Sequence, residues 1–176
     1  GGGGGAEWAV GGDGGENALP AGRAWGEGHA ALARNELPGA TKFFKLAASL
    51  DPGFLPARLW DAQMMEWVTP TDTVAWGSEA QIAEAGSSRL SLRDRALSLA
   101  LAAMSRHEFP TACTSYRKLL ATDSTDFAAW LGLGECQRLD RMVLPSRSSP
   151  SGFRFRSSYR AAGDAYQRAA QSNPVA

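Results

Sequence analysis

The apolar and small residues of the chain recur with helical spacing from about residue 22 to residue 172. Three segments carry the same stripe, in which a small residue is followed by an aromatic residue, a small or aliphatic residue and a breaker at offsets of four, three and five. The stripes are Ala40, Phe44, Ala47 and Pro52; Ala112, Tyr116, Leu119 and Ser124; and Ala162, Tyr166, Ala169 and Pro174. Offsets of four and three place side chains on one face of a helix. The pattern therefore predicts an internal helical repeat.

Each stripe follows another helix-length segment, so the repeating unit is a pair of helices. The first helices are expected at about 22–35, 54–67, 92–107 and 126–140, and their partners at about 38–50, 71–85, 109–122 and 157–172. Pro38 and Pro110 suit the first turn of a helix, where a missing N–H removes no hydrogen bond. The units are expected at about 21–54, 55–90, 92–126 and 127–174, with an insertion near 141–157 in the last one. We therefore expect one all-α domain over 21–176.

Gly134 lies inside a segment that otherwise favours a helix, FAAWLGLGECQRL at 127–139. A glycine within a helix costs about 1 kcal/mol relative to alanine, so we expect Gly134 to have a packing role. We predict that Gly134 lets its helix approach the partner helix at Ala162, with Trp130 filling the groove beside it. Gly28, twelve residues before Ala40, is expected to play the same part in the first unit.

Trp130, Leu133 and Gly134 match the signature of the first helix of a tetratricopeptide repeat, and the three stripes match that of its second helix. The chain resembles this helix–turn–helix family over about 21–174. The resemblance implies a tetratricopeptide-like helical-hairpin solenoid of about four antiparallel pairs, in which neighbouring units share a continuous core. The second unit lacks the stripe, and the tyrosine that the family carries in its first helix is absent here.

The irregular arrangement is also similar to repeat regions attached to bacterial serine/threonine protein kinases, where segments like RLSLRDRALSLALAAM and AWLGLGE occur in this order. This resemblance implies a bacterial signalling protein whose parent is membrane-anchored. The chain itself has no HRD, DFG or VAIK motif. We therefore expect a non-catalytic protein-interaction or regulatory module, and not an enzyme.

The tetratricopeptide resemblance further implies a concave groove lined by the first helices, which binds a peptide or protein segment. The groove residues carried over from the family are Trp25, His29, Leu59, Gln63, Glu66, Trp67, Leu101, Met104, Glu135 and Arg138. Helices or the N-terminal segment covering this groove remain an alternative at this point.

A second hypothesis is an extracytoplasmic small-ligand-binding or transport-accessory protein that uses the same groove around Trp67 and Met104. A third is an enzyme that uses His29 and Glu66. No motif supports the third hypothesis, because neither histidine of the chain lies in an HExxH pattern and no GxSxG elbow is present. We expect no cofactor and no metal site.

The net charge gives little information about function, because eighteen basic residues balance eighteen acidic residues in the 176-residue chain. A neutral chain has no global field that attracts nucleic acid, so we expect no nucleic-acid partner. No apolar run reaches the roughly 18 residues that span a bilayer. The glycine-rich segment 1–20 is expected to be a flexible tether. The chain begins with glycine, so we expect a fragment, and its compartment stays open.

The two cysteines and the insertion of the last unit carry further predictions. Cys113 and Cys136 are expected to be buried free thiols, with a single bridge between them as the alternative. The insertion RMVLPSRSSPSGFRFRSSYR interleaves Phe153 and Phe155 with arginines. We expect it to fold back with its phenylalanines inward and its arginines in solvent, although such a run could also stack on bases. Ser157 or Ser158 is expected to cap the last helix.

Overall fold

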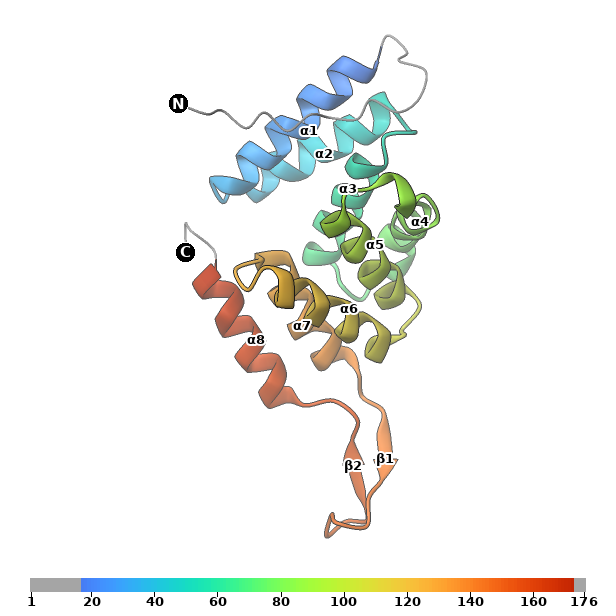
Figure 1. The fold of residues 1–176 in the computed structure, drawn as a ribbon, viewed down its shortest axis with the longest axis vertical. Helices are drawn as coiled ribbons and strands as arrows, with labels where there is room; N and C mark the ends of the chain where they lie inside the picture. The colour runs from blue at the N-terminus through green and yellow to red at the C-terminus, as the bar shows by residue number, and fades with distance from the viewer. Residues whose placement is uncertain (1–16, 173–176) are drawn as a thin grey trace.

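The computed structural model describes residues 17–172, which are mostly helical (Figure 1). The helices are α1 (Ala18–Ala33), α2 (Leu37–Leu50), α3 (Leu55–Val68), α4 (Thr73–Ala85), α5 (Leu92–Ser105), α6 (Phe109–Thr122), α7 (Phe127–Leu139) and α8 (Tyr159–Ser172), with a 3-10 turn at Ser87–Arg89. Two short strands, β1 (Val143–Pro145) and β2 (Phe153–Phe155), separate α7 from α8. Each helix packs against the next one in the chain, so the helices form an array of antiparallel pairs. The eight predicted helices are confirmed.

The first helix begins earlier than the sequence pattern indicated. Helix α1 starts at Ala18, so the last three residues of the predicted tether are helical, and residues 1–16 lie outside the described residues. Pro20 is compatible with this start because the first four N–H groups of a helix have no partner within the helix. Pro38 and Pro110 lie in the first turns of α2 and α6, as predicted.

The turns within the first and third pairs have the same construction. Asn35 and His107 adopt positive φ angles of 58° and 60°, and each lies between an arginine and a glutamate that form an ion pair across the turn. A positive φ is uncommon outside glycine, although asparagine and histidine tolerate it better than most residues. These two turns lie 72 residues apart, and the repeat is therefore visible in its loops as well as in its helices.

Glycines of the first helices pack against aromatic rings of the second helices. A Cβ atom added at Gly28 would lie 2.6 Å from the Phe44 ring, and one added at Gly134 would lie 2.6 Å from the Tyr166 ring. Both distances are far below van der Waals contact, so the helices meet at this separation only because the glycines have no side chain. The predicted role of Gly134 is thus correct in kind, but its partner is Tyr166 and not Ala162. The ring is the larger group and reaches the facing helix first.

The second pair keeps the same buried positions but changes the order of residue sizes. Trp76, Ala80 and Ala83 are fully buried on α4 at offsets of four and three, and Trp76 lies 36 residues after Ala40 and 36 before Ala112. The stripe therefore exists in this unit, with its aromatic residue one turn earlier. Sixteen residues before Ala80, where the first unit has Gly28 before Phe44, the chain carries buried Met64. A large residue opposite a small one preserves the packing volume.

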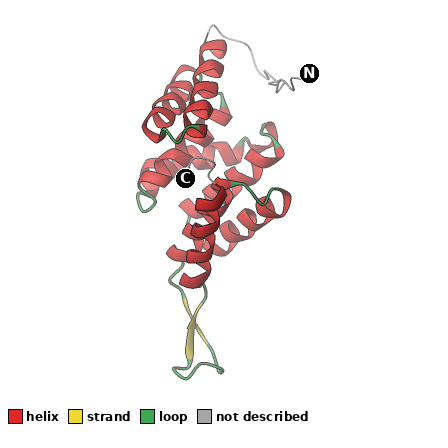
Figure 2. Ribbon diagram, turned by 90° about the vertical axis from the view of Figure 1, so that its left-hand side faces the viewer, coloured by secondary structure: helices red, strands yellow, loops and turns green. Residues whose placement is uncertain are grey.

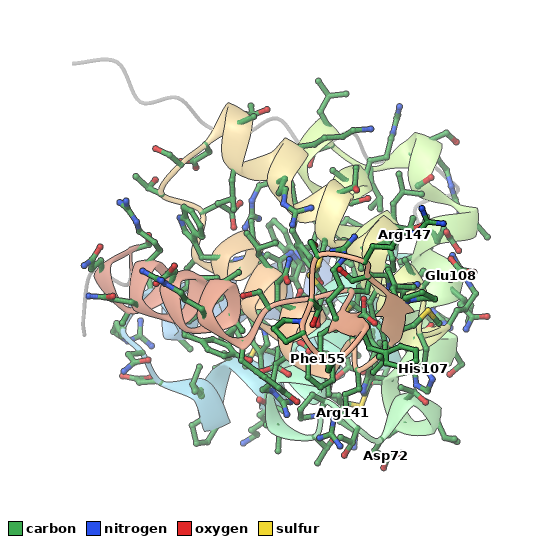
Figure 3. The ribbon with its side chains drawn as sticks, turned by 90° about the horizontal axis from the view of Figure 1, so that it is seen from below. Asp72, His107, Glu108, Arg141, Arg147 and Phe155 are labelled. Carbon is green, nitrogen blue, oxygen red and sulfur yellow. A yellow bond between two sulfur atoms is a disulfide. The ribbon has the colours of Figure 1, made fainter. Side chains whose placement is uncertain are left out.

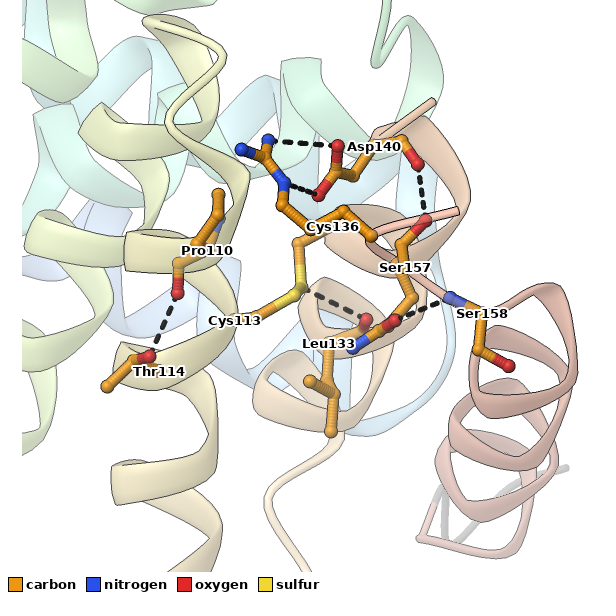
Figure 4. Close-up of a disulfide and its surroundings, with 10 residues drawn as sticks. Pro110, Cys113, Thr114, Leu133, Cys136, Asp140, Ser157 and Ser158 are labelled. Atoms are coloured by element: carbon orange, nitrogen blue, oxygen red, sulfur yellow. Dashed lines mark hydrogen bonds and ion pairs between the residues drawn. A yellow bond between two sulfur atoms is a disulfide. The ribbon is translucent and has the colours of Figure 1, made fainter. Parts of the chain in front are cut away.

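A disulfide joins α6 to α7. Cys113 and Cys136 are bonded, with their Cα atoms 5.7 Å apart (Figure 4). The prediction of two free thiols is therefore wrong, and the alternative of a single bridge is correct. Both residues lie on buried helix faces, and the sequence alone does not show that the third pair brings these faces together with the fourth.

The insertion forms a β-hairpin that projects from the end of the helical array (Figures 1 and 2). The strands are antiparallel, with Val143 opposite Phe155 and Pro145 opposite Phe153. The side chains of Phe153 and Phe155 are 56% and 55% exposed, so the prediction that they turn inward is wrong. The hairpin has only two strands and leaves the helices too far away for its rings to reach the core. Figure 3 views it from its tip.

The base of the hairpin is held to the end of α7. Arg156 donates two hydrogen bonds to the buried Asp140 carboxylate, at 2.7 and 2.9 Å, so this arginine is not free in solvent as expected. The Ser157 hydroxyl donates to the Asp140 carbonyl oxygen. The Ser158 hydroxyl accepts from the Ala161 N–H at 3.2 Å and caps α8, which confirms that part of the prediction.

Replacing Gly132 tests the glycine packing. Its added Cβ would overlap the ring of Tyr116, which is fully buried and cannot move aside. We expect Gly132→Ala to lower the free energy of unfolding by about 2 kcal/mol, since overpacking outweighs the gain in helix propensity. Gly163→Ala on α8 is the matched control. No atom lies within 4 Å of its added Cβ, so it should be neutral or stabilising in urea unfolding. Equal effects of the two substitutions would contradict the packing role.

Reducing the disulfide tests its contribution to stability. The bridge closes a loop between residues 23 positions apart, and loss of that constraint is expected to cost about 3 kcal/mol. The midpoint of urea unfolding should fall when a reductant is added. The double variant Cys113→Ala/Cys136→Ala should unfold at the same midpoint with and without reductant. A reductant effect that persists in this variant would show that the bridge is not its cause.

Candidate functional site

An open pocket of about 420 Å³ lies between the first helices of the pairs. Its walls come from the end of α1 and the turn after it, from α3, and from the beginnings of α5 and α7. The lining residues are His29, Leu32, Ala33, Asn35, Leu37, Trp60, Trp67, Arg93, Phe127, Ala128 and Leu131. Residues 102 positions apart in the chain, His29 and Leu131, thus meet in one hollow.

Aromatic rings form a continuous wall of this pocket. Trp60 stacks on Phe44 of α2 at a centroid distance of 5.6 Å and meets Trp67 edge-on at 6.4 Å. Trp67 in turn meets Phe127 of α7 edge-on at 5.4 Å. Ring pairs in such geometries attract one another beyond the area that they bury. The wall is therefore preformed, and it links the first unit to the fourth.

His29 belongs to this wall as a neutral ring. It makes edge contacts with Trp25, Phe44 and Trp60 at centroid distances of 4.3, 5.0 and 4.7 Å. Burial, and secondarily the positive charge of Arg93, lowers the pKa of His29 to about 4. The imidazole is therefore uncharged near neutral pH, and its buried Nε2 has no hydrogen-bond partner within residues 17–172.

Arg93 is the cationic residue of the pocket, and the protein itself neutralises its charge. Its guanidinium lies over the Trp60 ring at 5.3 Å and donates two hydrogen bonds to the Asp126 carboxylate, at 2.6 and 3.2 Å. Asp126 also accepts from the Ala129 N–H at 3.0 Å and so caps α7. One ion pair thus fixes the start of α7, and with it Phe127, against α5.

The predicted groove residues separate into three groups. His29 and Trp67 line the pocket, and Trp25 lies half-buried behind His29. Five others are buried in the core, with exposed fractions of 2% or less, and do not line the pocket. These are Leu59, Gln63, Glu66, Leu101 and Met104. Glu135 and Arg138 are half-buried on α7, where they contact α8 and do not line the pocket.

A polar cluster lies in the core between α3, α6, α7 and α8. The Gln63 amide donates to Glu66 at 3.0 Å, and on α7 the Arg138 guanidinium donates to Glu135 at 2.6 Å. The Tyr166 hydroxyl donates to Glu135 and accepts from Arg138. Burial, with the nearby charge of Glu135, raises the pKa of Glu66 to about 8. Glu66 is therefore a neutral carboxylic acid at neutral pH.

The same cluster contains a buried phenol. Tyr116 is fully buried, and its hydroxyl has no hydrogen-bond partner among the described residues. Burial, together with the charges of Glu66 and Glu135, holds the pKa of Tyr116 well above its usual range. An unpaired buried polar group costs roughly 1–3 kcal/mol, so this part of the core is less stable than its apolar surroundings.

The sequence did not indicate Trp60, Arg93 or Phe127 as pocket residues. Trp60 is adjacent to the predicted Leu59, and on α3 the tryptophan turns toward the pocket while the leucine turns into the core. Arg93 and Phe127 stand at helix starts, where an exposed position was the natural expectation. Their proximity depends on the curvature of the array, which no local pattern reports.

The described residues form neither a metal site nor a membrane-spanning helix. No group of three or more His, Cys, Asp or Glu side chains between residues 17 and 172 is placed to hold a metal ion. In the same range no helix is both long and apolar enough to cross a membrane. Comparisons with protein-family models, with curated proteins and with solved structures found no match to this chain. The function is therefore argued from the pocket and its surroundings.

The buried Glu66 predicts a pH dependence of stability. Its pKa is about 8 in the folded protein and near 4.5 when unfolded, so the native state binds the extra proton between these values. The stabilisation is complete below pH 4.5 and is lost as the pH rises toward 8. His29 and Asp61, with pKa values of about 4 and 6, change ionisation mainly at lower pH.

We expect the free energy of unfolding to fall by about 2 kcal/mol between pH 6.5 and pH 8 in the original protein relative to Glu66→Gln. The amide keeps the shape of the neutral acid and does not titrate. Urea unfolding at several pH values measures the difference. Glu27→Gln, on the exposed face of α1, should follow the original protein. Parallel curves for the original protein and Glu66→Gln would show that Glu66 does not titrate in this range.

Proposed function

We propose that this chain is a non-catalytic protein-interaction or regulatory module with a tetratricopeptide-like array, which binds a peptide or protein segment in the pocket between its first helices. The observation that carries the proposal is the preformed aromatic wall of His29, Trp60, Trp67 and Phe127 in an open hollow of about 420 Å³. Repeat arrays commonly use the face formed by equivalent helices to bind extended segments.

The chemistry of the pocket favours an apolar anchor on the partner. Leu32 and Leu131 face the hollow beside the aromatic rings, and the charge of Arg93 is already matched by Asp126. Large apolar side chains supply most of the energy at protein interfaces when they enter such pockets. The indole N–H of Trp67 and Nε2 of His29 are buried and have no partner among the described residues, so both rings present apolar surface to the hollow.

The place of the module in a bacterial signalling protein rests on the similarity of segments such as AWLGLGE to repeat regions attached to serine/threonine kinases. The repeated turns at Asn35 and His107, and the glycine–aromatic contacts of the first and last pairs, support the tetratricopeptide-like reading. In this role the array would recognise a partner segment and position a neighbouring domain.

A second function of another class is binding of a small molecule in the same pocket by an extracytoplasmic protein. Two observations favour it. A volume of about 420 Å³ lies within the range of small-molecule sites, roughly 300–1,000 Å³. The Cys113–Cys136 disulfide fits an oxidising compartment, where such bonds persist.

Selection of peptides from a displayed random library tests the proposed function. We expect selected peptides to share a large apolar residue and to bind Leu131→Glu at least tenfold more weakly than the original protein, because the variant places a carboxylate on the apolar wall. Leu92→Glu is the matched control, since Leu92 is highly exposed and lies outside the pocket. Equal binding to both variants would reject the pocket as the peptide site.

A thermal-shift screen with a metabolite panel distinguishes the alternative. A small molecule that raises the melting temperature of the original protein and of Leu92→Glu, but not of Leu131→Glu, would identify a ligand of this pocket. If no peptide is selected and such a molecule is found, small-ligand binding replaces peptide binding as the function.

A further inference from the structure

The projecting hairpin has a charge that the rest of the chain does not share. Residues 141–160 contain five arginines and no acidic residue. The other residues carry thirteen basic and eighteen acidic side chains, a formal net charge of −5, so the neutrality of the whole chain hides two regions of opposite sign. A local positive region of this kind attracts anionic surfaces even when the net charge is zero.

Most of this positive charge is available to a partner. Arg156 is bound by Asp140. The other four, Arg141, Arg147, Arg154 and Arg160, are exposed and form no ion pair with any residue between 17 and 172. In the view from the tip, Arg141 and Arg147 lie around the hairpin, and Phe155 lies between them and α8 (Figure 3). Unpaired guanidinium groups therefore lie at the base, on one strand and at the tip of the hairpin, and Arg154, which pairs with Leu144, lies on the face opposite Phe153 and Phe155.

Apolar side chains cover one side of the same hairpin. Because side chains alternate along a strand, the pairs Val143–Phe155 and Pro145–Phe153 share a face. Tyr159, at the start of α8, extends this face and meets Phe155 at a centroid distance of 6.3 Å. Val143, Phe153, Phe155 and Tyr159 are each about half exposed. Exposed apolar patches rimmed by polar residues mark interaction sites.

We propose that this hairpin is a binding arm for the surface of an anionic phospholipid bilayer. Arg141 and Arg147, at the base and the tip, would meet the lipid phosphates, and the apolar face would enter the boundary between headgroups and acyl chains. Aromatic residues favour that boundary, and each arginine near an anionic surface contributes to binding. The serine-rich tip, residues 146–152, suits an arm that lies along the surface with its apolar side down.

Two observations favour lipid over single-stranded nucleic acid as the occupant. Nucleic acid would use the flat rings and the arginines, but it gains little from the aliphatic Val143 and Pro145, which an acyl boundary buries as readily as phenylalanine. The Cys113–Cys136 disulfide also fits an oxidising compartment, where membrane surfaces are present and nucleic acid is not the usual partner. The inference does not depend on what the pocket binds.

Cosedimentation with lipid vesicles tests the proposal on the whole chain. The original protein should bind vesicles of phosphatidylcholine with phosphatidylglycerol and should not bind vesicles of phosphatidylcholine alone. Arg141→Gln/Arg147→Gln should weaken partitioning about thirtyfold. Phe153→Ser/Phe155→Ser should weaken it at least tenfold, because the apolar face loses both rings. The arm lies outside the helical core, so both variants should keep the original melting temperature.

Matched controls separate the arm from the rest of the surface. Arg23→Gln/Arg117→Gln removes two exposed arginines from α1 and α6, and Val74→Ser/Leu92→Ser removes two highly exposed apolar residues from α4 and α5. Both controls should bind anionic vesicles like the original protein. A loss of binding in the controls equal to that in the arm variants would overturn the proposal, as would the absence of any binding to anionic vesicles.

A labelled single-stranded oligonucleotide provides the competing occupant. If the original protein binds it, fails to bind anionic vesicles, and loses the oligonucleotide in both arm variants, the arm is a nucleic-acid site and the lipid proposal is wrong. Anionic vesicle binding that depends on both arginines and both phenylalanines supports the lipid proposal.

Discussion

The contact between a glycine of one helix and an aromatic ring of its neighbour sets the spacing of this array. At Gly28 and Gly134 the ring occupies the space that a Cβ would need, and Gly132 receives the fully buried Tyr116 from the preceding pair. The rings pack against the facing helices, and the first helices lie together on one side of the array. The pocket lies between these first helices. In the second pair, buried Met64 and Ala80 occupy the equivalent sequence positions with the opposite size order. Volume is conserved across the pair even though residue identity is not.

Residue spacing was enough to locate every helix and the insertion, because helical periodicity is a local property. Contacts between elements were harder to foresee. Ala162 and Tyr166 lie on the same face of α8, and only the packed structure shows that the ring is the group nearest Gly134. The Cys113–Cys136 bond and the meeting of Trp67 with Phe127 likewise depend on how successive pairs are rotated. The prediction that Phe153 and Phe155 turn inward assumed that the helical core lies nearby. The hairpin instead carries both residues away from that core.

The pocket and the polar cluster share α3 and α7 but differ in how firmly their side chains are held. The pocket wall is rigid because rings and the Arg93–Asp126 pair fix it, whereas the core behind α3 contains a neutral Glu66 and an unpaired Tyr116 hydroxyl. Polar groups left without partners in a core lower stability, and regions of low stability open first. The array thus joins a preformed binding surface to an interior with unpaired polar groups near α6 and α7, and the disulfide holds those two helices together.

The base of the hairpin makes the insertion independent of the helices that carry it. Asp140 binds Arg156 and accepts from Ser157, and the Arg156 N–H donates to the Met142 carbonyl at 2.8 Å, so the chain returns to the point where it left α7. The spacing of α7 and α8 is therefore set by contacts at the base of the hairpin, before the strands begin. Because loop length changes the closure entropy only slowly, residues 146–152 form a position where peptide tags, spectroscopic labels or whole guest sequences can be grafted without disturbing the array.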